Sequence, residues 1–128
     1  MTRSPVRIVL DASAIVAFTR GSIDVGEVIA EVADEEGAQI GLPVLCLAEA
    51  YRVSAGSDRL DLLVNRPAAL ILSPDPEDWR PLAVTCDTVG RLDAASAVLI
   101  AIDLGCDVLT AQPGLYAGLA GGGPIIPI

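Results

Sequence analysis

Short apolar runs of strand length alternate along the chain with longer segments that have helical periodicity. The runs occupy residues 6–10, 39–42, 69–72, 106–110 and 125–128. The first is rich in β-branched residues and stops at an acid, which fits a strand buried on both faces. The last contains Pro127, so we expect it at an edge of the sheet. Strands separated repeatedly by helices predict an α/β fold with a mostly parallel sheet of about five strands, flanked by helices.

Helices are predicted in the segments between these strands, each from its apolar spacing and its end signals. They start at Ala12, at Asp24 as a cap (to about Glu36), at Pro43 as first residue (to about Ala55), at Ser57 (to Arg66), at Pro76, and at Asp87 as a cap (to Leu104). A length of 128 residues falls within the size of one domain. We therefore expect residues 1–128 to form a single domain.

Composition limits the classes of function. The chain has 17 acidic and 8 basic residues and a net charge of −9, which repels phosphate backbones at long range. This counts against avid nucleic-acid binding. It does not exclude a nuclease, because a carboxylate-rich site attracts phosphate once divalent cations occupy it.

The chain has no His, and Cys46, Cys86 and Cys106 are widely separated, which argues against a zinc site. Its N-terminal segment lacks the apolar core of a signal peptide. The longest apolar run elsewhere, residues 94–102, is far shorter than the roughly 20 residues that cross a bilayer. We expect a soluble cytoplasmic protein with no membrane association, whose thiols are reduced and mostly buried.

Asp11 directly follows the first predicted strand. Ligands of doubly wound sheets gather at the carboxyl ends of the strands, so an acid here is a candidate ligand. Asp11 can equally cap the helix that follows it. Ser13 can likewise be a local turn or capping hydroxyl.

Glu49 is the single charge in the run VLCLAEAY at 44–51, on a helix that otherwise has the composition of a buried one. A carboxylate in such a setting needs a partner. Arg52, three residues further on, is one candidate and would make Glu49 part of an ordinary helix pair. A role as ligand is the other interpretation.

Asp93 begins another nearly all-apolar helical run, and it shares a helix face with Ala97, Ile100 and Leu104. Its side chain is therefore expected to open onto the interior or a cleft. The alternative is an acid placed favourably in a first helical turn, which needs no function.

Three carboxylates at strand or helix ends would repel one another unless a positive charge lies between them. A divalent cation is the economical solution. Hard Mg²⁺ or Mn²⁺ prefers oxygen ligands, which a chain without His mainly offers. Such a site can activate water and offset charge developing on a phosphodiester.

The order and setting of these residues resemble the PIN-domain family. The matching segments are IVLDASAI at 8–15, LAEA at 47–50, LDAASA at 92–97 and VLTAQPGLY at 108–116. The resemblance implies a Rossmann-like domain that binds Mg²⁺ or Mn²⁺ in an acidic pocket and cuts RNA, as many members do in the role of the VapC-type toxin of a toxin–antitoxin pair. It further implies that the metal ligands are Asp11, Glu49 and Asp93, that Ser13 and Thr110 are supporting hydroxyls, and that the chain forms a homodimer and binds an antitoxin protein.

One position departs from the family pattern. Where the family often has Thr-x-Asp after the fourth strand, this chain has Gln112, whose amide oxygen can ligate a metal or orient water but carries no charge. One negative charge fewer should weaken cation binding. A PIN-like fold that no longer cleaves and serves as a protein-binding module is thus an alternative, favoured also by the acidic balance.

An unrelated doubly wound domain that binds a small molecule ranks last, because the chain has no GxGxxG or GxxxxGK[ST] pattern. Arg20 and Arg52 are the basic residues best placed in sequence to approach a substrate near the three acids. Both can equally be surface charges paired with the surplus of carboxylates.

Overall fold

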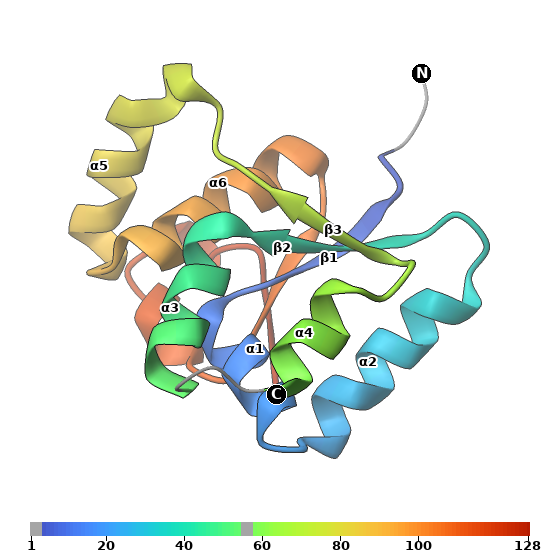
Figure 1. The fold of residues 1–128 in the computed structure, drawn as a ribbon. Coiled ribbons are helices and arrows are strands. Elements are labelled where there is room, and N and C mark those ends of the chain that lie inside the picture. The colour runs from blue at the N-terminus through green and yellow to red at the C-terminus, as the bar shows by residue number, and fades with distance from the viewer. Residues whose placement is uncertain (1–3, 55–57) are drawn as a thin grey trace.

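The computed structural model describes residues 4–54 and 58–128, and Figure 1 shows how their elements are arranged. Within these residues a five-stranded sheet has the order β3-β2-β1-β4-β5, and every neighbouring pair is parallel. The strands are β1 (Val6–Leu10), β2 (Gln39–Pro43), β3 (Ala69–Leu72), β4 (Asp107–Thr110) and β5 (Ile125–Pro127). The α/β, Rossmann-like fold with about five strands is confirmed, and so is the edge position of the strand that contains Pro127.

Helices cover both faces of this sheet. They are α1 (Ala12–Thr19), α2 (Ile23–Asp34), α3 (Val44–Ser54), α4 (Asp58–Val64), α5 (Trp79–Val89) and α6 (Leu92–Leu104), with short 3₁₀ turns η1 (Pro76–Asp78), η2 (Pro113–Tyr116) and η3 (Ala120–Gly122). Figure 1 shows α1, α2 and α4 on one side of the sheet and α5 and α6 on the other. Helix α3 contacts both α1 and α6, so it joins the two layers.

Two predicted helix starts are wrong. Pro43 is the last residue of β2, where it pairs with Leu72, and the helix begins one residue later. The second helix is capped by Ser22, whose hydroxyl accepts from the Val25 amide at 3.3 Å, while Asp24 lies inside the first turn. Proline is compatible with the end of a strand and with the start of a helix, so its presence does not decide between them. In the same way, Ser22 and Asp24 are both suitable N-cap residues. The predicted helix end at about Ala55 and the predicted helix start at Ser57 lie outside the described residues.

The predicted cap at Asp87 is also wrong, since Asp87 lies within the last turn of α5. Gly90 ends that helix in the left-handed conformation, at a φ of 82°, which a residue without a Cβ adopts at little cost. Arg91 follows in extended conformation and leads into α6. The two helices are therefore separated by a turn that directs the Arg91 side chain to the site described below.

The core is built mainly from aliphatic side chains of the central strands and of α6. Val9, Leu10, Val108 and Leu109 are fully buried, and each contributes roughly 1.5–3 kcal/mol to folding. Among the fully buried side chains the largest is Tyr116. Cys46 is buried, whereas Cys86 and Cys106 are partly exposed, so the expectation of buried thiols holds fully only for Cys46.

No helix in the described part of the chain is long and apolar enough to cross a membrane. The expectation that α3 is a buried helix is wrong in part, because only Cys46 and Ala50 of that helix are buried, while Tyr51 and Val53 are exposed. Glu49 thus lies at the border of a half-buried helix.

The chain changes direction between β1 and β4. From β1 it proceeds outward through β2 to β3, and β4 and β5 then extend the sheet on the other side. Leu10 pairs with Leu109, and the Asp11 amide donates to the Leu109 carbonyl at 3.2 Å. The carboxyl ends of β1 and β4 therefore lie side by side and form the topological switch point at which such sheets bind ligands.

Candidate functional site

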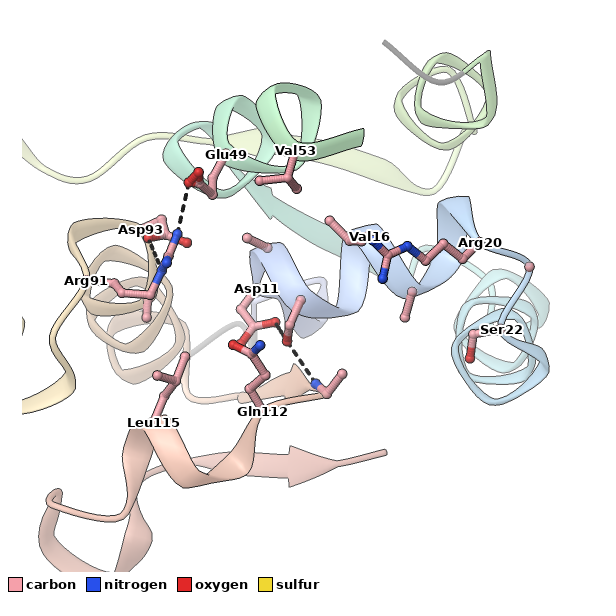
Figure 2. A pocket seen from close by; sticks show the side chains of 16 residues that line it. Asp11, Val16, Arg20, Ser22, Glu49, Val53, Arg91, Asp93, Gln112 and Leu115 are labelled. Atoms are coloured by element: carbon pink, nitrogen blue, oxygen red, sulfur yellow. Dashed lines mark hydrogen bonds and ion pairs between the residues drawn. The ribbon is translucent and has the colours of Figure 1, made fainter. Parts of the chain in front are cut away.

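A pocket of about 600 Å³ opens at this switch point, and the three acids singled out in the sequence line it together. Asp11 follows β1, Glu49 comes from α3 and Asp93 comes from the first turn of α6. Ser13 and Gln112 also line the pocket. Figure 2 shows Asp11, Glu49, Asp93 and Gln112 reaching one cavity from separate elements. The fold thus brings Asp11 and Asp93 to one pocket, although they lie more than 80 positions apart in the sequence.

Asp11 is only 2% exposed, and its carboxylate has three donors. The Ser13 hydroxyl donates to Oδ1 at 2.6 Å, and the Ala14 amide donates to the same oxygen at 3.0 Å. The Tyr116 hydroxyl donates to Oδ2 at 2.6 Å. Asp11 therefore caps α1, as one interpretation of the sequence holds, and at the same time forms part of the pocket wall.

Ser13 and Thr110 connect the two strand ends through their hydroxyls. The Ser13 oxygen accepts from the Ala111 amide at 2.9 Å and lies 3.2 Å from the Thr110 hydroxyl. The Thr110 oxygen accepts from the Gln112 amide at 2.9 Å. The bonds of Ser13 fix the loop after β4 against the first turn of α1. The structure therefore places both hydroxyls beside Asp11, although Thr110 itself is fully buried behind the pocket surface.

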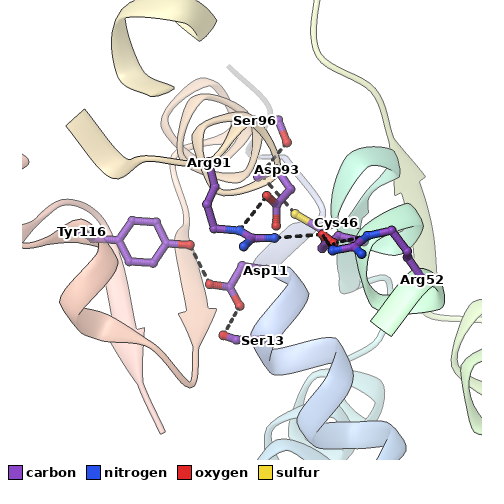
Figure 3. A network of polar contacts seen from close by, with 9 residues as sticks. Asp11, Ser13, Cys46, Arg52, Arg91, Asp93, Ser96 and Tyr116 are labelled. Carbon is purple, nitrogen blue, oxygen red and sulfur yellow. Dashed lines mark hydrogen bonds and ion pairs between the residues drawn. The ribbon is translucent and has the colours of Figure 1, made fainter. Parts of the chain in front are cut away.

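Tyr116 is a residue that the sequence interpretation did not assign to the site. It lies at the end of η2, is fully buried, and bonds Asp11 from the side opposite Ser13, as Figure 3 shows. Burial first, and the Asp11 carboxylate second, hold the pKa of the Tyr116 phenol far above its usual range. The phenol is therefore a permanent donor to Asp11. The available signal was a tyrosine in a chain with only 3% aromatic residues.

Cys46 lies behind the acids. Its thiol donates to the Asp93 backbone carbonyl at 3.2 Å. Burial, followed by the nearby charges of Asp93 and Asp11, raises the pKa of this thiol well above its usual range. A thiol held neutral in this way acts as packing between α3 and α6 and does not supply a nucleophile.

Glu49 and Asp93 are joined by Arg91. The Arg91 Nη2 lies 2.9 Å from Glu49 Oε2, and its Nε lies 3.0 Å from Asp93 Oδ1. Figure 2 shows the Arg91 guanidinium in contact with both carboxylates. Both carboxylate side chains are mostly covered, at 14% and 13% exposure, whereas Arg91 is 42% exposed. A cation of the chain itself therefore occupies the space between two of the three acids.

Arg52 also pairs with Glu49, from the solvent side, through a two-pronged contact in which Nε lies 2.7 Å from Oε1. This contact is the helix pair that the sequence offered as an alternative. Hydrogen bonding to Arg52 first, and the charges of Arg52 and Arg91 next, hold the pKa of Glu49 below its ordinary value. Arg52 is 73% exposed and does not line the pocket, so of the two arginines that pair with Glu49 it is Arg91 that lines it.

Arg91 was missed in the sequence because it belongs to a short turn and not to a recognisable motif. Its position two residues before Asp93 was a usable signal, since an arginine at this spacing can reach back to a carboxylate in the first helical turn. Arg20, which was singled out, does line the pocket, next to Gly21 and Ser22. Figure 2 shows Arg20 at the end of the pocket away from Arg91.

The atoms around the pocket that could bind a metal ion are carboxylate, hydroxyl and amide oxygens. The residues present therefore fit a hard divalent cation in chemical type. A carboxylate has roughly four lone-pair sites. Three of those of Asp11 accept hydrogen bonds from Ser13, Ala14 and Tyr116, which leaves one for a metal ion. Across residues 4–54 and 58–128, no three His, Cys, Asp or Glu side chains are grouped closely enough to hold a metal ion. In this arrangement Arg91 forms ion pairs with two of the three acids, Glu49 and Asp93.

Asp107 and Asp103 do not take the place of the acid missing at position 112. Asp107 is exposed at the amino end of β4, opposite the pocket edge of the sheet. Asp103 lies in the last turn of α6 and lines a separate cleft together with Asp75 and Asp78. Gln112 is exposed on the wall of the main pocket, where the family pattern would have an acid.

Comparison with known proteins finds no family model and no curated protein that matches the chain. Among solved structures, the crystal structure of PAE2754 from Pyrobaculum aerophilum superposes with a TM-score of 0.66 over 96% of this chain and 85% of that chain, at 19% identity. At this identity the similarity establishes the arrangement of the elements and not the chemistry of the site. The chain therefore shares the α/β, Rossmann-like fold of that protein.

Proposed function

We propose that the chain is a metal-dependent endoribonuclease of the PIN type, in which Asp11, Glu49 and Asp93 hold Mg²⁺ or Mn²⁺. The observation that carries this proposal is the meeting of three acids, distant in sequence, around one pocket at the switch point of the sheet. The resemblance of four segments to the PIN family supports it independently of the geometry.

In this proposal each residue of the site has a defined task. When bound, the divalent cation supplies an activated water and stabilises charge on the scissile phosphodiester. Asp11 is held in one orientation by Ser13, Ala14 and Tyr116, so its remaining lone pair is directed by the protein and not by solvent. Arg20 on the pocket wall is available to pair with a substrate phosphate.

An RNA-cleavage assay with Mg²⁺ or Mn²⁺ tests the proposal. Asp11→Asn should lower the cleavage rate by about 100-fold or more, since it removes a charged ligand and costs several kcal/mol of transition-state stabilisation. The matched control is Asp107→Asn, which changes an exposed acid at the opposite end of β4 and should leave the rate unchanged. Equal cleavage by the wild type and Asp11→Asn would remove Asp11 from the mechanism.

A second candidate is a PIN-like domain that no longer cleaves and acts as a protein-binding module. The pairing of Arg91 with both Glu49 and Asp93 favours it, as does the neutral Gln112 on the pocket wall. Titration with Mn²⁺ separates the two candidates. Binding that Glu49→Gln abolishes supports a metal centre, whereas no binding at millimolar concentration supports the module.

The partners that belong to the proposed nuclease are an RNA substrate, a second copy of the chain and an antitoxin protein, all acting in the cytoplasm. Exposed apolar side chains beside the pocket support a protein partner. Val53 is 49% exposed and also lines the pocket, and Tyr51 on the same helix is 62% exposed. Light scattering with and without a co-expressed candidate antitoxin measures both associations.

A further inference from the structure

Arg91 makes its contacts with the oxygen atoms that a cation in this pocket would need. It bonds Glu49 Oε2 and Asp93 Oδ1, and it thereby bridges α3 and α6. Ion pairs between partly exposed groups contribute little to folding, with typical values of roughly 0–1 kcal/mol each. This bridge is thus not required to hold the two helices together, because Cys46 and the surrounding core already pack there.

The bridge does change the charge of the pocket. Three carboxylates line it, together with the guanidinium groups of Arg91 and Arg20. Arg91 lies between Glu49 and Asp93 and reduces the repulsion between their carboxylates. The attraction of these two acids for a divalent ion is therefore also reduced. A divalent cation and a guanidinium cannot both occupy the space between the same two oxygen atoms, because they repel and exclude each other.

Arg91 is also free to leave. Its side chain is 42% exposed, so moving it outward removes little buried surface. Its backbone is extended at the N-cap of α6, where the Arg91 carbonyl accepts from the Ala95 amide at 3.0 Å, and this bond does not involve the side chain. The Asp93 and Glu49 side chains, in contrast, are mostly covered by their surroundings.

We infer that Arg91 is an internal cation that competes with the divalent ion for Glu49 and Asp93, so that the ion binds only as the guanidinium is released. This inference rests on the proposed metal site and adds what regulates it. Arg91 sets the concentration of ion at which the site fills, while Gln112 and Asp11 set which ligands complete it.

Calorimetric titration with Mn²⁺ alone tests the competition. Arg91→Gln should tighten Mn²⁺ binding by about tenfold, because the ion no longer has to break two ion pairs. Arg52→Gln is the matched control, since it removes the same charge from Glu49 on the solvent side without touching the pocket, and it should change the affinity less than about threefold. Thermal unfolding of each variant establishes that it is folded.

A second measurement uses the wild-type chain only. The Nε–H resonance of Arg91 should move with added Mg²⁺ toward the position of an exposed arginine, with the same midpoint as a calorimetric titration with Mg²⁺. An Nε–H resonance that stays fixed while Mg²⁺ binds overturns the inference. This readout does not depend on how any variant folds.

The outcomes separate this inference from the function on which it rests. Equal Mn²⁺ affinity in the wild type and Arg91→Gln, or equal tightening in Arg52→Gln, overturns the competition and leaves the metal site standing. Binding by Arg91→Gln but not by the wild type supports it in its strongest form. Failure of both folded proteins to bind overturns the proposed metal centre together with the inference.

Discussion

The hydrogen bond between Tyr116 and Asp11 should contribute more to the free energy of unfolding than most other single contacts in the fold. Tyr116→Phe removes one hydroxyl and leaves the ring in place, so it creates almost no cavity. It leaves the Oδ2 atom of a carboxylate that is 2% exposed without its 2.6 Å donor. Hydrogen bonds to charged groups contribute about 1.5–3 kcal/mol, and we expect a loss of about 2 kcal/mol.

Urea and thermal unfolding measure this loss. For a chain of this size, 2 kcal/mol corresponds to a fall in Tm of roughly 6–10 °C. Tyr51→Phe is the natural control, because Tyr51 is 62% exposed, and its stability should change by less than about 0.5 kcal/mol. The two variants remove the same atom from the only two tyrosines of the sequence.

The pH dependence gives the same contact a second signature. The raised pKa keeps Tyr116 protonated in the folded chain, whereas in the unfolded chain it ionises above about pH 10. Wild-type stability should therefore fall as the pH rises above that value, and Tyr116→Phe should lack this component. A loss at neutral pH below about 0.5 kcal/mol, or loss terms that simply add in a double-mutant cycle with Asp11→Asn, would refute the reasoning.

Two further predictions concern Glu49 and Gln112. Because Arg52 and then Arg91 hold the pKa of Glu49 below its ordinary value of 4.5, ionised Glu49 stabilises the fold above that value, and the contribution is lost as the pH falls through the lowered pKa. Urea midpoints of Glu49→Gln should thus fall less between pH 7 and pH 3 than those of the wild type, and parallel acid limbs would contradict this. Gln112→Asp should tighten Mn²⁺ binding about tenfold by calorimetry, since it adds a negative charge to the pocket wall, and an unchanged affinity would exclude Gln112 as the weakening feature.

The sheet could be predicted from the sequence because its information is local. Each strand is a short aliphatic run, and Pro127 marks the edge, so number, order in the chain and edge position follow from residues read one segment at a time. Helix starts were harder. Ser22 and Asp24 are both good caps, and Gly90 and Asp87 both give plausible boundaries, so only packing decides between them.

That Asp11, Glu49 and Asp93 are candidates could also be predicted, since each is a charge in an apolar run, and the structure places all three on one pocket. What surrounds them could not. Arg91 and Tyr116 reach the site from segments without a pattern of their own, and their roles depend on distances set by the whole fold. The sequence offered Arg52 as a partner of Glu49 alone, whereas the structure also supplies Arg91, which pairs with both Glu49 and Asp93.

The charge of the whole chain makes this internal cation consequential for the proposed function. With a net charge of −9, the protein gains nothing from long-range attraction to RNA, so attraction has to arise locally at the pocket. While Arg91 is paired with Glu49 and Asp93, it attracts a phosphate group only weakly, because the two carboxylates already offset its charge. If a divalent ion took its place at Glu49 and Asp93, the charge of Arg91 would no longer be offset by these acids, and the ion and Arg20 would add further positive charge to the pocket. The proposed nuclease should therefore acquire its affinity for RNA only after the ion binds, and RNA binding by a catalytically silent Asp11→Asn chain should not respond to added Mg²⁺ in the way that wild-type binding does.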